Sequence, residues 1–303
     1  LEGPQAPRLA LSRGVHLVFN HADLPVRNTV VMRTPDGRRI FAVPLGQYTY
    51  IGTTDDYHPE FEYWPPVTEQ DVSYLLSATR RVMPEARLSP EQIVSVWSGI
   101  RPLVGDGSGR ASKELSRKDE VWTSPSGLLS VGGGKLSAYR AMAERVVDTV
   151  IENHDFTAKP CATAQVPLPG GETAVSADRL SGVEGAPAER LARLYGAEAS
   201  EVVSSAGEGG LLAAEVRQAV LREGALRLED YWARRSSRAW FDHDAGLPVL
   251  TQAADVMANL LGWDDSRKAT EINNCREIDR ASRSGFQSAT TSLGEADDYR
   301  AAS

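Results

Sequence analysis

The residues best suited to chemistry form a glycine turn, Gly132, Gly133 and Gly134, followed directly by Lys135. A short apolar run at 127–131 precedes the turn. Apolar residues at a 3.6-residue period follow it, so the predicted order is strand, turn and a helix with one buried face. The first turn of a helix presents unpaired N–H groups and the positive end of the helix dipole. With Lys135 beside it, this helix start indicates a site for an electron-rich ligand group.

The turn matches neither of two common phosphate-binding motifs. Ser137 stands where a dinucleotide fingerprint would have its last glycine, and no second strand with an acidic residue follows about 20 residues later. A P-loop would require a glycine in place of Leu129 and a serine or threonine in place of Leu136. Two interpretations of the turn therefore stay open, a bound ligand and simple packing.

Three more polar residues fit a site at this turn. Arg101 follows a predicted strand at 92–97, and the chain is expected to turn away after that strand. Arg117 lies in a glycine-rich loop, and His16 lies inside an apolar strand. Taken singly, His16 is typical of a core histidine and Arg117 of a solvated loop charge. Grouped with Lys135, they predict a pocket for a small phosphate or carboxylate.

The elements that must position these residues predict an α+β fold. Residues 14–56 contain short β-rich runs joined by turn signals, which is typical of an antiparallel meander. A helix with a capping box at Thr68 follows and ends before Pro84. After a linker at 157–186, only helical signals occur, and Gly262 is expected to cap one of these helices.

The composition excludes several classes of protein. A net charge of −8 argues against general nucleic-acid binding. No apolar run approaches the ~18 residues that span a bilayer. The two cysteines, Cys161 and Cys275, lack C-x-x-C spacing, which predicts a reducing compartment and no thiolate metal site. We expect no bound metal.

Five segments carry a resemblance to a known family. They are 14–18 (GVHLV), 50–55 (YIGTTD), 97–103 (WSGIRPL), 116–117 (SR) and 123–135 (TSPSGLLSVGGGK). In this order they resemble the FAD-dependent (respiratory, bacterial-type) glycerol-3-phosphate dehydrogenases, and residues 215–235 are similar to the C-terminal domain of that family. The resemblance covers residues ~10 to ~280, although related amine- and hydroxyacid-oxidising flavoenzymes share parts of it.

The resemblance implies a domain organisation. An antiparallel substrate-binding sheet is combined with the C-terminal part of an FAD-binding (glutathione-reductase/D-amino-acid-oxidase-like) domain, and an all-α C-terminal domain follows. The expected boundaries are 1–156 for the partial FAD-dependent oxidoreductase domain, 157–186 for the linker, 187–282 for the helical domain and 283–303 for a disordered tail. Within the first domain, the substrate sheet spans about 14–90 and the flavin-facing strand–turn–helix about 92–153.

The chain also departs from the family pattern. The N-terminal segment with the glycine fingerprint for the FAD pyrophosphate is absent, since no G-x-G-x-x-G occurs. The chain therefore reads as part of a longer protein. Ser137 replaces the threonine that is usual in the family and keeps its hydroxyl. Mitochondrial members of the family carry a calcium-binding extension. The D-x-[DN]-x-[DN]-G pattern of a calcium-binding loop does not occur here, so we expect a bacterial-type member.

The resemblance assigns roles to the site residues. It places Gly132, Gly133, Gly134, Lys135, Leu136 and Ser137 at the flavin. Negative charge develops near N1 of a reduced flavin, and helix N–H groups with Lys135 would stabilise it. Arg101, Arg117 and Lys135 would bind the substrate. His16 and Arg101 are the implied catalytic residues, the histidine accepting the proton of the C2 hydroxyl.

The implied reaction oxidises sn-glycerol 3-phosphate to dihydroxyacetone phosphate, with FAD reduced and its electrons passed to a quinone or another acceptor. The implied protein is cytoplasmic, with peripheral contact to the inner face of the cell membrane, and a homodimer is an open expectation. One alternative is a related flavin-dependent amino-acid or amine oxidase, which would need a single arginine for a carboxylate. Another is a non-catalytic cap and interaction fragment.

Overall fold

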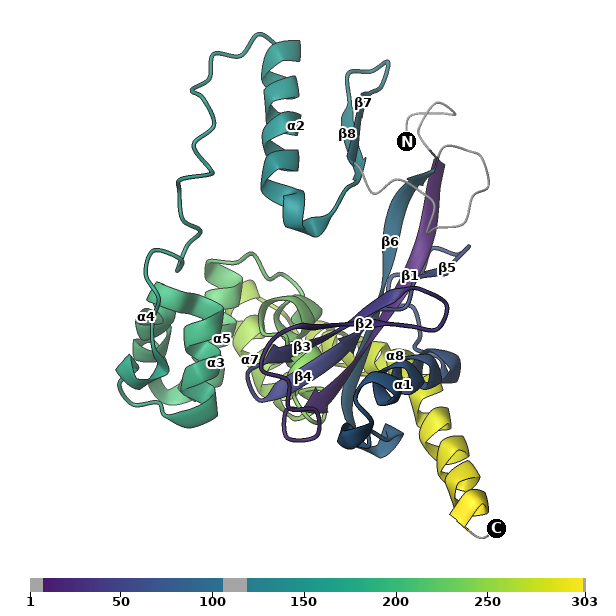
Figure 1. Ribbon diagram of the computed structural model, residues 1–303. Coiled ribbons are helices and arrows are strands. Elements are labelled where there is room, and N and C mark those ends of the chain that lie inside the picture. Colours follow the sequence, from purple (N-terminus) through teal and green to yellow (C-terminus); the bar gives the residue numbers. More distant parts are fainter. Residues whose placement is uncertain (1–7, 106–118, 302–303) are drawn as a thin grey trace. The chain divides into compact units, whose positions relative to one another are not determined.

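The computed structural model describes residues 8–105 and 119–301 (Figure 1). The chain divides into two compact units. The first unit comprises Leu1–Gly14, Asp55–Tyr63 and Gly99–Pro167, and the second comprises Val15–Thr54, Trp64–Ser98 and Leu168–Ser303. The predicted substrate sheet and the helical domain thus fall mostly in one unit, whereas the glycine turn belongs to the other.

Most strands form one sheet with the order β2-β3-β4-β1-β5, and β6 also pairs with β1. A separate hairpin joins β7 and β8. The strands are β1 (Arg8–Asn20), β2 (Val30–Arg33), β3 (Arg39–Leu45), β4 (Tyr48–Gly52), β5 (Asp56–Tyr57), β6 (Ile93–Gly105), β7 (Asp119–Thr123) and β8 (Leu129–Gly133). The antiparallel pairing of β1 with β4, β2 with β3 and β3 with β4 confirms the predicted meander.

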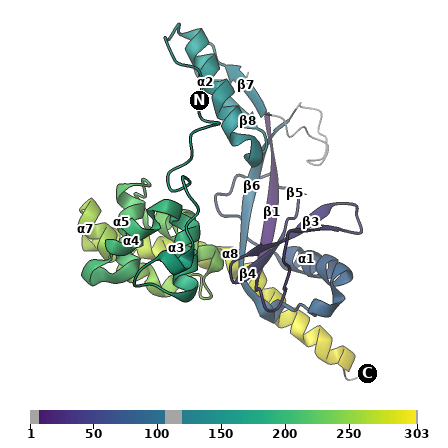
Figure 2. The same cartoon turned by 60° about the vertical axis from the view of Figure 1, so that its left-hand side comes forward.

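One long helix packs on the sheet and most of the others follow the linker. The helices are α1 (Glu69–Val82), α2 (Tyr139–Asn153), α3 (Gly185–Tyr195), α4 (Ala199–Ser204), α5 (Gly210–Leu221), α6 (Arg238–Phe241), α7 (Leu250–Leu261) and α8 (Asp265–Ala301). In Figure 2, α3, α4, α5 and α7 gather into one bundle, in green to yellow-green. The bundle corresponds to the predicted helical domain. It has two hydrophobic cores, one formed by residues of α3, α4 and α5 and the other by residues of α5 to α8.

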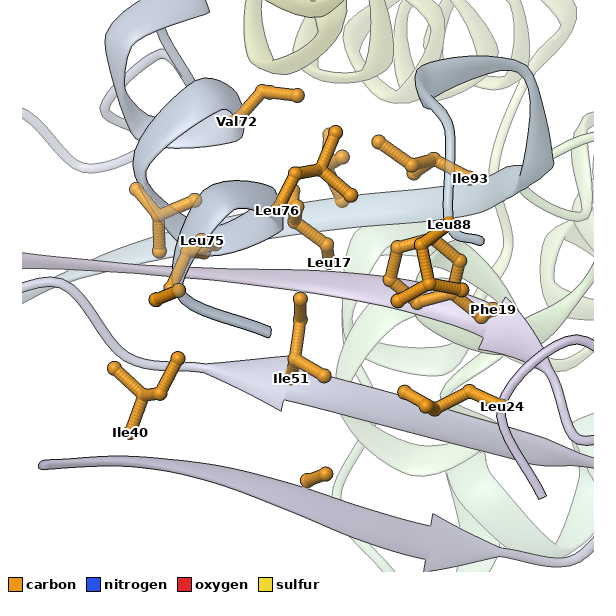
Figure 3. Close-up of a cluster of buried hydrophobic side chains, with 14 of the residues drawn as sticks. Leu17, Phe19, Leu24, Ile40, Ile51, Val72, Leu75, Leu76, Leu88 and Ile93 are labelled. Atoms are coloured by element: carbon orange, nitrogen blue, oxygen red, sulfur yellow. The ribbon is translucent and has the colours of Figure 1, made fainter. Parts of the chain in front are cut away.

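The core of the sheet lies between its strands and α1 (Figure 3). Leu17 of β1 and Ile51 of β4 are fully buried on this face, against Leu75 and Leu76 of α1. Successive side chains of a strand point to opposite faces. His16, between buried neighbours on β1, therefore lies on the face of the sheet away from α1.

The two predicted helix caps are confirmed. The Thr68 hydroxyl accepts from the Asp71 backbone N–H at 3.3 Å, and the Asp71 carboxylate accepts from the Thr68 N–H at 2.8 Å. This reciprocal pair fixes the start of α1. Gly262 ends α7 with φ of 70°, the left-handed conformation that glycine adopts without steric cost.

One prediction about the strands was wrong. The chain does not turn away after 92–97, because β6 continues through Arg101 to Gly105. Within the described residues β6 pairs only with β1, so it is an edge strand. An edge strand tolerates Pro102, which has no backbone N–H to donate. The short strand β5 follows β4 and pairs with Ser12 and Arg13 of β1. The predicted loop 105–118 lies outside the described residues from 106 onward.

The helix after the glycine turn differs from the prediction in two ways. Leu136–Ala138 form a 3₁₀ turn, and the α-helix begins only at Tyr139. No residue of α2 is buried, and Leu136 is 89% and Val147 54% exposed. The apolar period of α2 is real, but the residues on this face are only half-buried or exposed.

The C-terminal region is more helical than predicted. The segment 283–303 was expected to be disordered, whereas α8 runs on to Ala301. The segment contains no proline that would end a helix already begun at Asp265. Between α5 and α6 the chain forms a π-helical turn at Asp230–Arg235. Within the described part of the chain, no helix has the length and apolar character needed to cross a bilayer.

The two cysteines should differ in reactivity. Cys161 is exposed and Cys275 is buried, and burial raises the pKa of Cys275 to about 12. The thiolate is the reactive form, so at about pH 8 a thiol reagent should modify Cys161 quickly and Cys275 hardly at all. Mass spectrometry of the labelled protein would measure this, with both cysteines reacting in denaturant. Fast labelling that persists in Cys161→Ser would contradict the burial of Cys275.

Candidate active site

His16 lies in a row of residues that crosses four strands. On β1 and β4, His16 pairs with Gly52. Gly52 pairs with Phe41 on β3, and Phe41 pairs with Val31 on β2. Paired residues share a face of the sheet, so this row lies on the face away from α1. Phe41 is 40% and Val31 57% exposed, and the row therefore offers an accessible apolar surface beside a histidine.

Gly52 makes room for the His16 ring. A Cβ atom at position 52 would lie 2.2 Å from His16 Cδ2, far inside van der Waals contact. The imidazole therefore lies directly across the backbone of β4. Gly52 was not among the predicted site residues, although a glycine inside a strand is a signal for a close approach of this kind.

Two aromatic side chains hold the His16 ring from its other sides. Trp97 of β6 stacks on it with ring centroids 4.8 Å apart and an interplanar angle of 15°. Tyr50 meets it edge-on at 6.0 Å. Burial raises the pKa of Tyr50 above its usual value, so the phenol stays protonated at neutral pH. Neither residue was predicted to belong to the site.

The glycine turn belongs to the first unit. Gly132 and Gly133 end β8, opposite Glu120 and Asp119 of β7. Gly134 has φ of 83°, and a Cβ there would lie 2.5 Å from Met142 Cε. At Gly134 the turn thus requires glycine for its own backbone and packing, which supports the packing interpretation of that residue.

The residues after the turn are open to solvent. Lys135, Leu136 and Ser137 are exposed, and they stand at the beginning of the helical segment as predicted. An open groove of about 550 Å³ runs from here along α2. Its lining is apolar apart from one cation and consists of Val131, Gly133, Lys135, Leu136, Tyr139, Met142, Ala143, Val146 and Val147. Such a surface can hold a flat apolar group with negative charge at one edge.

Arg101 also belongs to the first unit. Its Nη1 lies 3.6 Å from Asp55 Oδ1, and the Ser12 hydroxyl donates to the same carboxylate. The Arg101 side chain is 30% and the Asp55 side chain 13% exposed. Asp55 therefore orients a guanidinium that solvent still reaches. The ion pair was not predicted, because Asp55 and Arg101 are far apart in the sequence.

The structure thus separates the predicted site residues into two groups. His16 lies in the second unit, with Gly52, Tyr50 and Trp97. Arg101 and the residues of the glycine turn lie in the first unit. Arg117 lies outside the described residues. Within the described part, no cluster of histidine, cysteine and carboxylate side chains could hold a metal ion.

Comparison with known proteins identifies the family. Residues 1–140 match the family described as FAD dependent oxidoreductase, and residues 161–268 match the C-terminal domain of alpha-glycerophosphate oxidase. The aerobic glycerol-3-phosphate dehydrogenase of Bacillus subtilis is 32% identical over 88% of this chain and 53% of its own length. That of Staphylococcus saprophyticus is 32% identical over 93% of this chain and 55% of its own length. The chain belongs to the FAD-dependent glycerol-3-phosphate dehydrogenase family.

A solved structure of this family agrees in fold. The glycerol-3-phosphate dehydrogenase from Bacillus halodurans complexed with FAD is similar with a TM-score of 0.76 and 31% identity. The match covers 90% of this chain and 57% of that chain. It confirms the predicted fold class and the predicted resemblance. The chain spans about half the length of the curated relatives that it matches.

Proposed function

We propose that this chain supplies the substrate-binding face and the ring end of the flavin site of an enzyme that oxidises sn-glycerol 3-phosphate to dihydroxyacetone phosphate with FAD. The observation that carries the proposal is the match to aerobic glycerol-3-phosphate dehydrogenases over about nine-tenths of the chain. The comparisons do not favour an amino-acid or amine oxidase.

The exposed turn suits the ring end of a flavin. The open groove beside it is apolar, and Lys135 supplies a positive charge at its end. FAD, when bound, supplies the acceptor for the hydride from C2 of the substrate. We infer that Lys135 and the backbone N–H groups of Leu136 and Ser137 stabilise the negative charge that this transfer brings to the ring.

The oxidation also releases the proton of the C2 hydroxyl, and His16 is the residue proposed to accept it. Its ring is held by Gly52 and Trp97 on an accessible face of the sheet. A histidine is suited to this task because its charge changes near neutral pH. A ring fixed in one orientation loses less entropy when the substrate arrives.

Arg101 is proposed to bind the phosphate or the C2 oxygen of the substrate, with Arg117 as a second cation. Asp55 holds the Arg101 guanidinium from one side, and 30% of the arginine side chain stays accessible. An oriented guanidinium matches phosphate oxygens better than a mobile one, because its N–H groups form a rigid fork.

The electron acceptor and the location are also proposals. We infer a quinone as the acceptor, which fits relatives named as aerobic dehydrogenases. An acceptor of that kind lies in a membrane. Contact with the inner face of the cell membrane would then be peripheral, because no described helix is suited to cross it.

Arg101→Ala should reduce kcat/KM for sn-glycerol 3-phosphate by about 10²- to 10³-fold, the usual effect of removing a donor that stabilises developing charge. The bound flavin should remain, because Arg101 is assigned to the substrate. An artificial dye as electron acceptor measures the first quantity, and the flavin absorbance per protein measures the second.

Two controls sharpen this test. Arg145→Ala removes another arginine of the first unit, one that is 53% exposed and pairs with Asp119, and it should leave kcat/KM within about twofold because exposed ion pairs contribute little. The unmodified enzyme should also prefer glycerol 3-phosphate strongly over glycerol. Flavin loss in Arg101→Ala would contradict the assignment to substrate, and equal rates with glycerol would contradict the proposed function.

A further inference from the structure

A group of aromatic rings joins His16 to the helical domain. On the sheet, Trp97 stacks on His16 at 4.8 Å and meets Tyr50 at 5.4 Å. From α6 of the helical domain, Phe241 meets the Trp97 ring edge-on at 5.5 Å. Trp240 meets the same ring at 6.1 Å. All of these residues belong to the second unit.

We infer that Phe241 is a positioning residue, which holds Trp97 against His16 and so lets the helical domain set the orientation of the proposed catalytic histidine. The inference rests on the proposed role of His16. It also gives the helical domain a task beyond packing.

The position of Phe241 is set from both sides of α6. Arg238, at the start of the helix, donates to Asp242 at 2.7 Å, to the buried carboxylate of Glu215 at 3.3 Å and to the Tyr231 hydroxyl at 3.2 Å. On the sheet side, the buried Ser95 hydroxyl donates to the Ala239 carbonyl at 3.3 Å. A four-residue helix has little stability of its own. These contacts therefore decide where Phe241 stands.

The effect on His16 follows from the missing side chain at position 52. The imidazole lies against the bare backbone of β4 at Gly52, so no side chain at that paired position restrains the ring. The side-chain restraint then comes from the aromatic neighbours, and Trp97 is the one that stacks on the imidazole. Phe241 also touches Tyr50, at 6.3 Å, and so contacts both aromatic neighbours of the histidine.

Phe241 can be shortened without emptying the core. It is half-buried, and it borders a cavity of about 500 Å³ between the β3–β4 turn and the helices of the same unit. Phe241→Leu therefore removes a ring at the edge of an existing space and should fold.

The test combines a resonance of His16 with steady-state kinetics. In protein labelled with ¹³C at the histidine ring, the stacked Trp97 should shift the His16 ring protons upfield, and His16→Gln assigns the signal among the five histidines. Phe241→Leu should reduce that shift and lower kcat about 3- to 10-fold, the range expected for one aromatic pair. KM should stay within about twofold, because the substrate contacts are unchanged.

Controls separate positioning from general damage. Phe61→Leu makes the same chemical change at a phenylalanine that is 81% exposed, and it should alter neither quantity. Phe241→Tyr keeps the aromatic ring, so the His16 ring-proton shift and kcat should both stay at their values in the unmodified enzyme. If Phe241→Leu does not fold, Phe241→Met removes the same ring with a more adaptable side chain and tests the same contact.

The outcomes are distinct. An unchanged His16 resonance in the folded Phe241 variant would overturn the inference whatever the activity. A reduced resonance shift together with a reduced kcat would support it. If the enzyme does not oxidise glycerol 3-phosphate at all, the proposed function fails, while the resonance still decides whether Phe241 positions His16.

Discussion

Gly52→Ala is expected to lower kcat by about 10²-fold, the cost of displacing a catalytic group by ~1 Å. The added Cβ would lie 2.2 Å from His16 Cδ2 and 2.8 Å from both Cγ and Nε2 of the same ring. The imidazole must swing away, since the backbone of β4 is held between β1 and β3. The loss of stability should be small, about 0.5–1.5 kcal/mol for an unfavourable rotamer.

The measurement is turnover with glycerol 3-phosphate, alongside the thermal midpoint of unfolding. Gly99→Ala is a steric control, because Gly99 also lies in a strand and an added Cβ there would meet nothing within 4 Å. It should leave the midpoint and the His16 ring resonance as they are. A Gly52→Ala enzyme with normal kcat would show that the orientation of His16 does not matter to the reaction.

Glu215→Ala is expected to destabilise the helical domain by about 3–5 kcal/mol, the usual result of removing one partner of a buried ion pair. The Glu215 side chain is 3% exposed and accepts from Arg190 at 2.7 Å and Arg238 at 3.3 Å. Burial lowers the pKa of Arg238, but Tyr231, Glu215 and Asp242 outweigh that effect and raise it above its usual value. Arg238 therefore stays charged, and the substitution leaves two cations, 17% and 18% exposed, without the buried carboxylate that they share.

Denaturant unfolding would measure this loss of free energy. Glu198→Ala is the matched control, because Glu198 pairs with Arg222 at 3.7 Å and the Arg222 side chain is 60% exposed. Exposed pairs contribute about 0.2–1 kcal/mol, so this variant should lose little. Equal losses in the two variants would mean that the buried pair does not hold the domain together.

Elements defined by neighbouring residues were predicted well. The capping box of α1 and the glycine cap of α7 depend on residues a few positions apart, and both are confirmed. The meander followed from short β runs and turn residues. Elements that depend on partners distant in the sequence were not predicted well. The strand β6 runs on past Pro102 because β1 lies alongside it, a pairing that no local pattern reveals.

The apolar face of α2 illustrates a second limit. Its 3.6-residue period predicts a buried stripe, yet Val147 is 54% exposed. Periodicity reports which face of a helix is apolar, and it does not report what covers that face. Only the structure shows that the residues of this face are half-buried or exposed.

The sequence by itself determined the family and the types of residue that carry the chemistry, a histidine on a strand, an arginine after Trp97 and a glycine turn before a helix. These patterns involve residues close together in the sequence, so they can be recognised without knowledge of the fold. Only the tertiary structure decided which residues meet. It brings Gly52 under His16, Trp97 onto the His16 ring and Asp55 to Arg101. Strand pairing joins residues that are distant in the chain, and the register that does so is set by packing on both faces of the sheet.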